Sequence, residues 1–320
     1  MEKHGGTLDE NSIDFSISVN PYTPEWKGAL FKRCEEISSR YTYVEWIEER
    51  FRKIFGEDTV ITAGATEAFS IIGRIIEGRK VIIPSPSYGE YERVALKSDV
   101  VKIPPRNSKV DIDIALEVAM NLSKEHNTAI FLGNPNNPTG EYFRIEKEIE
   151  FLANKGVLFV LDEAFIDFVD KEKRWQIDHP NVIVIRTFTK SYGMPGIRVG
   201  YVKNKSLMDF FESNRLPWAI GSCGYAFIEF LLIDNGKFLN ESIPMIRQEA
   251  IRFRKIGIQT DANFGILKVG NASAVQESLD RVGIHVRNCG SFGLTEWIRV
   301  AVRKKEENDR LFEAIKKVIK

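Results

Sequence analysis

One lysine in the chain stands where covalent chemistry is expected. Lys190 follows the apolar run 182–185, which is typical of a buried strand, and enters a loop rich in glycine and proline that includes Arg198. A lysine that leaves a buried strand in this way can lose contact with water, which lowers the pKa of its amine and makes it nucleophilic. A solvated loop lysine would show the same local pattern, so the residues upstream decide between the two interpretations.

Small residues begin a predicted helix earlier in the chain. Gly64, Ala65 and Thr66 follow the predicted strand 59–62. Small side chains allow backbone N–H groups to approach an anion, and the helix dipole favours negative charge there. A plain capped helix would look the same. The chain has neither a P-loop lysine nor the glycine pattern of dinucleotide-binding folds, so nucleotide binding and a dehydrogenase function are not supported.

Two more loops with polar side chains follow predicted buried strands. Residues 133–140 read Gly-Asn-Pro-Asn-Asn-Pro-Thr-Gly, in which the Asn-Pro steps and the last glycine indicate a constrained loop. Asp162 and Glu163 follow the next strand. A carboxylate at a buried strand end needs a cationic partner. Two acidic residues in this position also occur in solvated loops and metal sites.

The elements that must position these residues alternate between strand and helix patterns. This alternation predicts an α/β fold with a doubly wound, mainly parallel sheet, and the continuous apolar runs from residue 100 onward predict strands buried on both faces. Ligands of such sheets bind beyond the carboxyl ends of the strands, which is where the candidate residues lie. The predicted strands are 59–62, 81–83, 100–103, 129–132, 157–161 and 182–185, and the predicted helices are 44–55, 66–76, 89–96, 112–123 and 144–154.

After about residue 205 the pattern changes. A long amphipathic helix is predicted at 243–256, followed by short strands at 265–269, 284–287 and 297–302 and a last helix at 306–319. We interpret this region as a smaller α+β domain with the N-terminal arm folded back against it. The expected boundaries are 1–34 for the arm, 35–240 for the large domain and 241–320 for the small domain.

Composition narrows the class of protein. The chain has 320 residues, and its 45 basic and 45 acidic residues cancel, which argues against nucleic acid or an anionic membrane as a partner. No apolar run approaches the length that spans a membrane. Cys34, Cys223 and Cys289 have neither metal-ligand nor disulfide spacing. We therefore expect a cytoplasmic protein with no metal site.

Taken together, the candidate residues describe a site for pyridoxal 5'-phosphate. They supply a phosphate cradle, an aromatic plate at Tyr88, an amide at Asn137, a carboxylate at Asp162 and a lysine. The chain resembles fold-type I pyridoxal-phosphate enzymes of the class I/II aminotransferase superfamily over essentially its whole length. The string 133–140 and the spacing from the lysine to Arg198 are specific to that superfamily.

The resemblance implies a role for each cofactor-binding residue. Lys190 would bind the cofactor covalently, and Asp162 would pair with its ring nitrogen. Asn137 would donate to the phenolic oxygen while Tyr88 stacks on the ring. The residues that would hold the cofactor phosphate are Gly64, Ala65, Thr66, Thr187 and Arg198.

The same resemblance implies a substrate site and a dimer. Arg299 matches the arginine that binds the substrate α-carboxylate, where its planar fork allows bidentate bonding. Tyr41 matches the tyrosine that reaches the cofactor phosphate of a neighbouring subunit, which implies a homodimer. The superfamily usually has Tyr-Pro at this point, and Thr42 departs from that pattern.

One branch of the superfamily is favoured. His4-Gly5-Gly6, Asn20-Pro21 and the segment 283–289 resemble threonine-phosphate decarboxylases, which are relatives of histidinol-phosphate aminotransferases. Phe165 is also decarboxylase-like, because aminotransferases usually have a tyrosine there. This resemblance implies decarboxylation of L-threonine O-3-phosphate to an aminopropanol phosphate, a step in cobalamin synthesis.

In that interpretation Asn20 and Arg299 would hold the substrate carboxylate, and His4 and Arg287 would bind the substrate phosphate; His4 could equally lie outside the site. Two alternatives remain open. Histidinol-phosphate aminotransferase would use nearly the same cofactor residues, and a non-catalytic sensor or scaffold could retain the fold.

Overall fold

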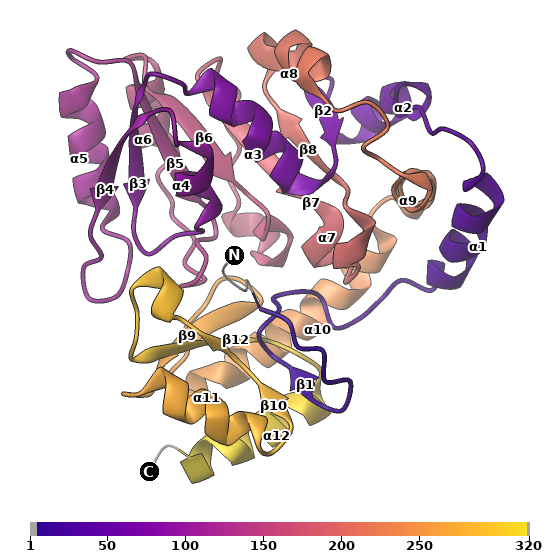
Figure 1. The fold of residues 1–320 in the computed structure, drawn as a ribbon, viewed down its shortest axis with the longest axis vertical. Helices are drawn as coiled ribbons and strands as arrows, with labels where there is room; N and C mark the ends of the chain where they lie inside the picture. Colours follow the sequence, from indigo (N-terminus) through magenta and orange to yellow (C-terminus); the bar gives the residue numbers. More distant parts are fainter. Residues whose placement is uncertain (1–4, 319–320) are drawn as a thin grey trace.

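The computed structural model describes residues 5–318, which form a large sheet domain and a smaller α+β domain (Figure 1). The large sheet has seven strands, and β8 runs antiparallel to both of its neighbours while all other pairs are parallel. The prediction of an α/β fold with a mainly parallel sheet is therefore confirmed. In spatial order the strands are β2 (Thr59–Thr62), β8 (Gly200–Lys203), β7 (Val182–Thr187), β6 (Leu158–Asp162), β5 (Thr128–Gly133), β3 (Lys80–Pro84) and β4 (Asp99–Ile103).

Helices cover both faces of this sheet because apolar side chains alternate along its strands. In β5, Ala129 and Phe131 pack into one hydrophobic cluster, whereas Ile130 and Leu132 pack into another. The first cluster includes side chains of α3 (Gly64–Ile75), α4 (Glu90–Val94) and α8 (Met208–Asn214), and the second those of α5 (Ile112–Leu122) and α6 (Glu146–Ala153).

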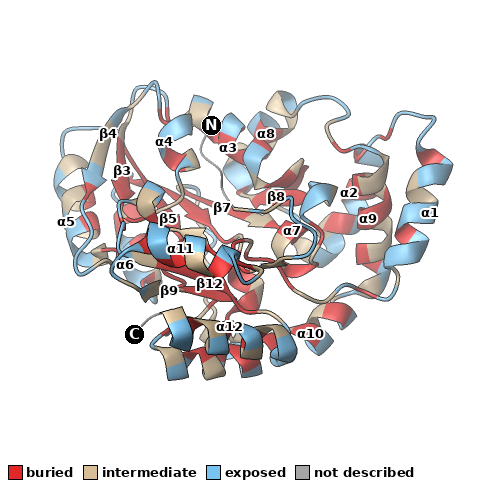
Figure 2. Cartoon of the chain, turned by 60° about the horizontal axis from the view of Figure 1, so that its bottom comes forward, coloured by how far each residue is buried: buried red, intermediate tan, exposed pale blue. Residues whose placement is uncertain are grey.

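Strand β4 is less buried than its sequence predicts. It forms one edge of the sheet, and the side chains of Asp99 and Lys102 are exposed. The expectation that 100–103 is buried on both faces is wrong, because an apolar run does not show whether a strand has neighbours on both sides. Figure 2 shows how the interior strands remain buried beneath helices with exposed outer faces.

A third group of helices packs beside the β2–β8 edge. It contains α1 (Lys27–Ile37), α2 (Glu45–Phe55), α7 (Phe188–Ser191) and α9 (Ser222–Asp234). Cys34 of α1 and Cys223 of α9 form a disulfide, which corrects the expectation that the cysteines are unpaired. The sequence could not show this pairing, because the two residues are 189 positions apart and meet only when the helices pack. Cys289 is a free, buried thiol.

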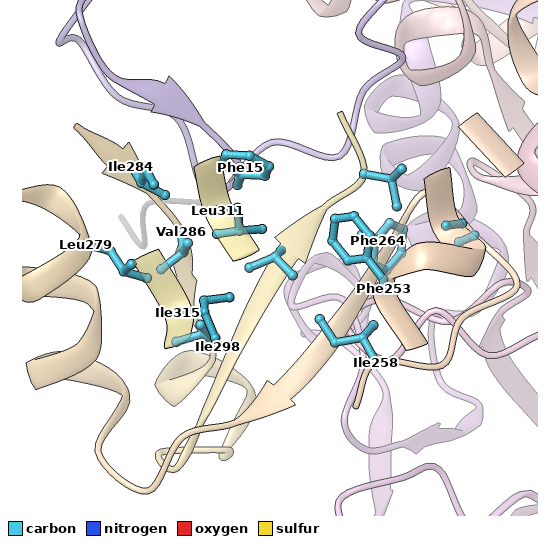
Figure 3. Packing of buried hydrophobic residues seen from close by; sticks show 14 of the residues in the cluster. Phe15, Phe253, Ile258, Phe264, Leu279, Ile284, Val286, Ile298, Leu311 and Ile315 are labelled. Atoms are coloured by element: carbon cyan, nitrogen blue, oxygen red, sulfur yellow. The ribbon is translucent and has the colours of Figure 1, made fainter. Parts of the chain in front are cut away.

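The smaller domain contains a segment from each end of the chain. Strands β9 (Phe264–Lys268), β12 (Trp297–Ala301) and β11 (Arg287–Asn288) form an antiparallel sheet, and β10 (Ile284–His285) pairs in parallel with β1 (Ile13–Asp14). Phe15, which follows β1, lies fully buried in the same cluster as Ile284 and Leu311 (Figure 3). The helices here are α10 (Lys237–Phe253), α11 (Ala272–Asp280) and α12 (Lys305–Val318).

Within residues 5–318, no helix has both the length and the apolar character needed to cross a membrane.

Candidate active site

A cavity of about 160 Å³ opens at the carboxyl ends of the central parallel strands. Residues of the large sheet, of α3, of β12 and of the N-terminal arm line it. Most of the residues predicted to bind the cofactor or the substrate carboxylate meet here: Ala65, Thr66, Tyr88, Asn137, Asp162, Thr187, Lys190, Arg198 and Arg299.

Asp162 ends β6 with its carboxylate buried. Its Oδ2 accepts a hydrogen bond from the Tyr91 hydroxyl at 2.8 Å, and its Oδ1 accepts one from the Ala164 N–H at 3.0 Å. Burial raises the pKa of Asp162, and these hydrogen bonds oppose that rise. Among residues 5–318, no basic side chain forms an ion pair with this carboxylate. A buried acid without a cationic partner fits the protonated ring nitrogen of pyridoxal phosphate.

Lys190 lies in α7, directly after β7. Burial lowers its pKa to about 8, helped by the charges of Arg299 and Arg198, whereas Asp162 has the opposite effect. Its Nζ lies 5.9 Å from the centre of the Phe165 ring. The amine can therefore lose its proton close to neutral pH, which a covalent attachment to an aldehyde requires.

The hydroxyl group of Thr187 fixes the start of α7. It accepts a hydrogen bond from the Thr189 N–H at 3.3 Å and donates one to the Val199 carbonyl at 3.0 Å. These two hydrogen bonds connect the turn that carries Lys190 to Val199, which directly precedes β8. Both Thr187 and Thr189 line the cavity.

The residues predicted to hold the cofactor phosphate, 64–66 and Arg198, meet at the N-terminus of α3. Arg198 Nη2 donates to Thr66 Oγ1 at 3.2 Å. Gly64 has a φ of +68°, and a Cβ atom there would lie 2.6 Å from Arg198 Nη2. The left-handed backbone angle favours glycine, and a Cβ atom would displace the Arg198 guanidinium from its position; the helix N-terminus and this guanidinium together fit a phosphate.

Arg299 approaches the cavity from β12. It is buried and donates from Nη1 to Asn137 Oδ1 and from Nη2 to the Ser16 carbonyl at 2.6 Å. Its Nε is buried without a hydrogen-bond partner, and within residues 5–318 no carboxylate pairs with it. Burial lowers the pKa of Arg299 to about 10. A buried guanidinium with an unused N–H fits an incoming carboxylate.

Asn20, Arg287 and Tyr41 were also predicted to belong to the site but do not line this cavity. Asn20 donates from Nδ2 to the Ser191 carbonyl at 2.8 Å and accepts from the Tyr22 N–H. Its side chain therefore stabilises the backbone directly after Lys190 and does not line the cavity. Arg287 lies on β11, next to the lining strand but outside the lining. Tyr41 is 66% exposed. His4 lies outside the described residues.

Several lining or supporting residues were not predicted from the sequence. Phe69 and Thr189 line the cavity, and so does Ser18, whose buried Oγ has no hydrogen-bond partner within residues 5–318. Tyr91, the donor to Asp162, was also missed. Its only sequence signal is the spacing of three residues after Tyr88, which places two aromatic residues on one side of a helical turn.

Comparison with known proteins establishes the family. The sequence pattern of "Aminotransferase class I and II" matches residues 19–315, so the chain belongs to this family of pyridoxal 5'-phosphate-dependent enzymes. It is 31% identical to a putative threonine-phosphate decarboxylase of Caldanaerobacter subterraneus subsp. tengcongensis, over 98% of this chain and 93% of that protein. It is 32% identical to histidinol-phosphate aminotransferase 2 of Archaeoglobus fulgidus, over 97% and 94% of the two chains.

A solved structure shares the whole fold. The histidinol-phosphate aminotransferase of Clostridium acetobutylicum superposes with a TM-score of 0.82 at 25% identity, covering 95% of this chain and 98% of that one. Both relatives and structure therefore place the chain among pyridoxal-phosphate enzymes named either decarboxylase or aminotransferase.

Proposed function

We propose that the protein decarboxylates L-threonine O-3-phosphate to an aminopropanol phosphate, as in cobalamin synthesis. The observation that carries this proposal is a pair of arginines. Arg287 of β11 and Arg299 of β12 are register partners, and directly paired residues of antiparallel strands have their side chains on the same face of the sheet. Two neighbouring guanidinium groups suit a substrate that carries two anionic groups.

Each arginine would bind one of these groups. Arg299, which lines the cavity, would hold the α-carboxylate, and Arg287 would bind the phosphate. Among residues 5–318, the buried Nε of Arg287 has no hydrogen-bond partner, and its Nη2 donates to Ser291 Oγ at 2.7 Å. Threonine phosphate carries a carboxylate and a phosphate on one molecule, whereas an aminotransferase would meet them on two substrates, the phosphate on histidinol phosphate and the α-carboxylate on glutamate.

The remaining cavity residues would hold the cofactor and control its protons. Asp162 would keep the ring nitrogen protonated, and Asn137 and Tyr88 would orient the ring above the lysine. When bound, pyridoxal phosphate withdraws electrons from the α-carbon bond that lies perpendicular to its ring. Arg299 would turn the carboxylate into that orientation. Lys190, with a pKa of about 8, could then deliver a proton to the α-carbon after CO2 leaves.

Phe165 supports the decarboxylase over the aminotransferase. Its ring lies beside Lys190 Nζ and packs edge-on against Phe264 with centres 4.6 Å apart. The tyrosine usual in aminotransferases would add a hydroxyl group here. A hydrogen bond to a charged group contributes about 1.5–3 kcal/mol, enough to change the proton affinity of the site.

The second candidate is a histidinol-phosphate aminotransferase. The similarity to the Archaeoglobus fulgidus protein supports it as strongly as the other relative supports the decarboxylase. The same lysine would then remove the α-proton instead of returning one. The two reactions differ in which α-carbon bond is held perpendicular to the cofactor ring, and a misplacement of about 1 Å can change a rate about 100-fold.

The deciding experiment follows two products with the same purified holoenzyme. Threonine phosphate is added in one reaction, and the amino donors glutamate and histidinol phosphate in the other, with no keto acceptor present, while CO2 and pyridoxamine phosphate are measured. Release of CO2 without stoichiometric pyridoxamine phosphate supports the decarboxylase. Pyridoxamine phosphate from glutamate without CO2 from threonine phosphate would replace our proposal with the aminotransferase. A Lys190→Ala variant controls for reactions of free cofactor.

We also propose a homodimer with shared sites. The rings of Tyr41 and Trp218 contact each other with centres 4.7 Å apart and planes tilted by 36°, and both are largely exposed beside a cavity of about 340 Å³. Exposed aromatic clusters of this kind mark protein interfaces. A second copy bound here would bring Tyr41 toward the neighbouring cofactor phosphate. Sedimentation equilibrium tests the proposal, and a purely monomeric holoenzyme would contradict it.

A further inference from the structure

A second tyrosine stands behind the cavity and has no part in the roles assigned so far. Tyr91 of α4 is 1% exposed, and its hydroxyl donates to Asp162 Oδ2 at 2.8 Å. Within residues 5–318 it is the only side chain that donates a hydrogen bond to this carboxylate; the other donor is the Ala164 backbone. The carboxylate is therefore held by one side chain and one peptide group.

The packing of the Tyr91 ring fixes the direction of this hydroxyl. The ring stacks on Phe131 with centres 5.1 Å apart and planes at 18°, and it meets Tyr88 edge-on at 5.8 Å. Phe69 closes a third side at 5.6 Å. Contacts with three aromatic rings therefore hold the Tyr91 ring in place, because protein interiors are close-packed.

Space for the hydroxyl is left by a glycine. Gly133 ends β5, and a Cβ atom built there would lie 3.0 Å from the Tyr91 hydroxyl oxygen. The absence of a side chain at Gly133 therefore leaves the space beside Asp162 that the Tyr91 hydroxyl group occupies.

The electrostatics show why this contact matters. Burial raises the pKa of Asp162, and the Tyr91 hydroxyl is the largest influence in the opposite direction, ahead of the Ala164 N–H and Lys190. Burial and the charge of Asp162 raise the pKa of Tyr91 far above its ordinary value. The hydroxyl consequently remains protonated and can act only as a donor toward the carboxylate.

We infer that Tyr91 is a positioning residue, which holds the Asp162 carboxylate in place at the cavity so that it can pair with the protonated ring nitrogen of the cofactor. This inference rests on the role proposed for Asp162 and is independent of whether the reaction is decarboxylation or transamination.

A double-mutant cycle on the purified protein tests it. Tyr91→Phe, Asp162→Asn and the double variant are compared with the parent by their dissociation constants for pyridoxal 5'-phosphate. Loss of one hydrogen bond to a charged group predicts about tenfold weaker cofactor binding in Tyr91→Phe. If Tyr91 acts through Asp162, the same substitution causes no further loss in the Asp162→Asn background.

A spectroscopic readout separates positioning from a structural defect. In the Tyr91→Phe holoenzyme, the proton on Lys190 Nζ is expected to titrate at higher pH, because the ring nitrogen holds its positive charge less firmly and repels that proton less. The visible absorbance of the bound cofactor follows this titration. Tyr192→Phe is the matched control, since Tyr192 is also a buried tyrosine that donates to a carboxylate, Asp234 Oδ2 at 3.4 Å.

The outcomes are distinct. Non-additive loss of affinity with a shifted titration in Tyr91→Phe, and neither effect in Tyr192→Phe, supports the inference. Equal losses in the parent and Asp162→Asn backgrounds would show that Tyr91 acts through the fold and would overturn it. If Asp162→Asn itself keeps the parent affinity and titration, the proposed role of Asp162 fails, and the inference fails with it.

Discussion

Without its cofactor, the protein is expected to hold Lys190 as a reactive amine near neutral pH. Its pKa is about 8, compared with the ordinary value of 10.5. At pH 7 a group with the lower value is roughly one-tenth neutral, whereas an ordinary lysine is about 0.03% neutral. The neutral fraction of Lys190 is therefore about 300-fold larger, and it is half-maximal near pH 8.

Competitive acetylation of the apoprotein, read by peptide mass spectrometry across a pH series, measures this titration. Burial slows the labelling of Lys190 at every pH but leaves the midpoint unchanged. Lys53 is the internal control, because it is exposed and its ion pair with Glu49 at 2.7 Å raises its pKa. Lys53 should therefore titrate well above Lys190 in the same samples.

Two variants check the cause of the low pKa. Arg299→Gln removes one of the cations that oppose the lysine charge, so the Lys190 midpoint should rise. Asp162→Asn removes the anion that favours the charge, so the midpoint should fall. A parent midpoint near that of an ordinary lysine, or shifts of the opposite sign, would refute the argument that burial and these two charges activate the amine.

Three further predictions follow from the site and the fold. Arg287→Ala should raise KM for threonine phosphate by about 10- to 100-fold through loss of a charged hydrogen-bonding group, with the cofactor dissociation constant unchanged; equal losses of both would contradict its role. Gly64→Ala should weaken cofactor binding about tenfold or more, measured by fluorescence titration. Gly78→Ala is the control and should leave cofactor binding unchanged: both glycines have positive φ, but a Cβ atom at Gly78 meets nothing within 4 Å. Replacing both Cys34 and Cys223 with serine should lower the free energy of unfolding by about 2–4 kcal/mol in urea denaturation, and unchanged stability would show that the bridge constrains nothing.

The sequence predicted the central sheet well because its strands are short apolar runs separated by helical patterns. The predicted strand 59–62 coincides with β2, and β6 and β7 lie within a residue or two of their predicted bounds. The loops that follow such strands could be assigned to a site because parallel strands bring their carboxyl ends to one edge.

Elements outside this pattern were missed for physical reasons. Helix α9 is apolar on nearly all sides because it lies inside a helical layer, so it shows no amphipathic period. The predicted strand 284–287 is divided into β10 and β11, which pair with different partners on either side of Val286. Pairing partners are set by tertiary contacts, which a local pattern does not record.

The same limit applies to the site. Asn20 was expected at the substrate carboxylate because of its place in a family pattern, yet its amide donates a hydrogen bond to the Ser191 carbonyl, next to Lys190. Tyr91 gave no comparable signal, because its importance depends on a contact with Asp162, which is 71 residues away in the sequence.

The pairing of β1 with β10 also constrains how the chain can fold as it is synthesised. The N-terminal strand is made first, but its partner and the cluster around Phe15 come from the last part of the chain. The large sheet can assemble while the ribosome is still translating, whereas the arm must wait unpaired until residues beyond β10 have emerged. The Ser16 carbonyl of that arm accepts a hydrogen bond from Arg299, and Ser18 lines the cavity, so the active site is complete only when the two ends of the chain meet.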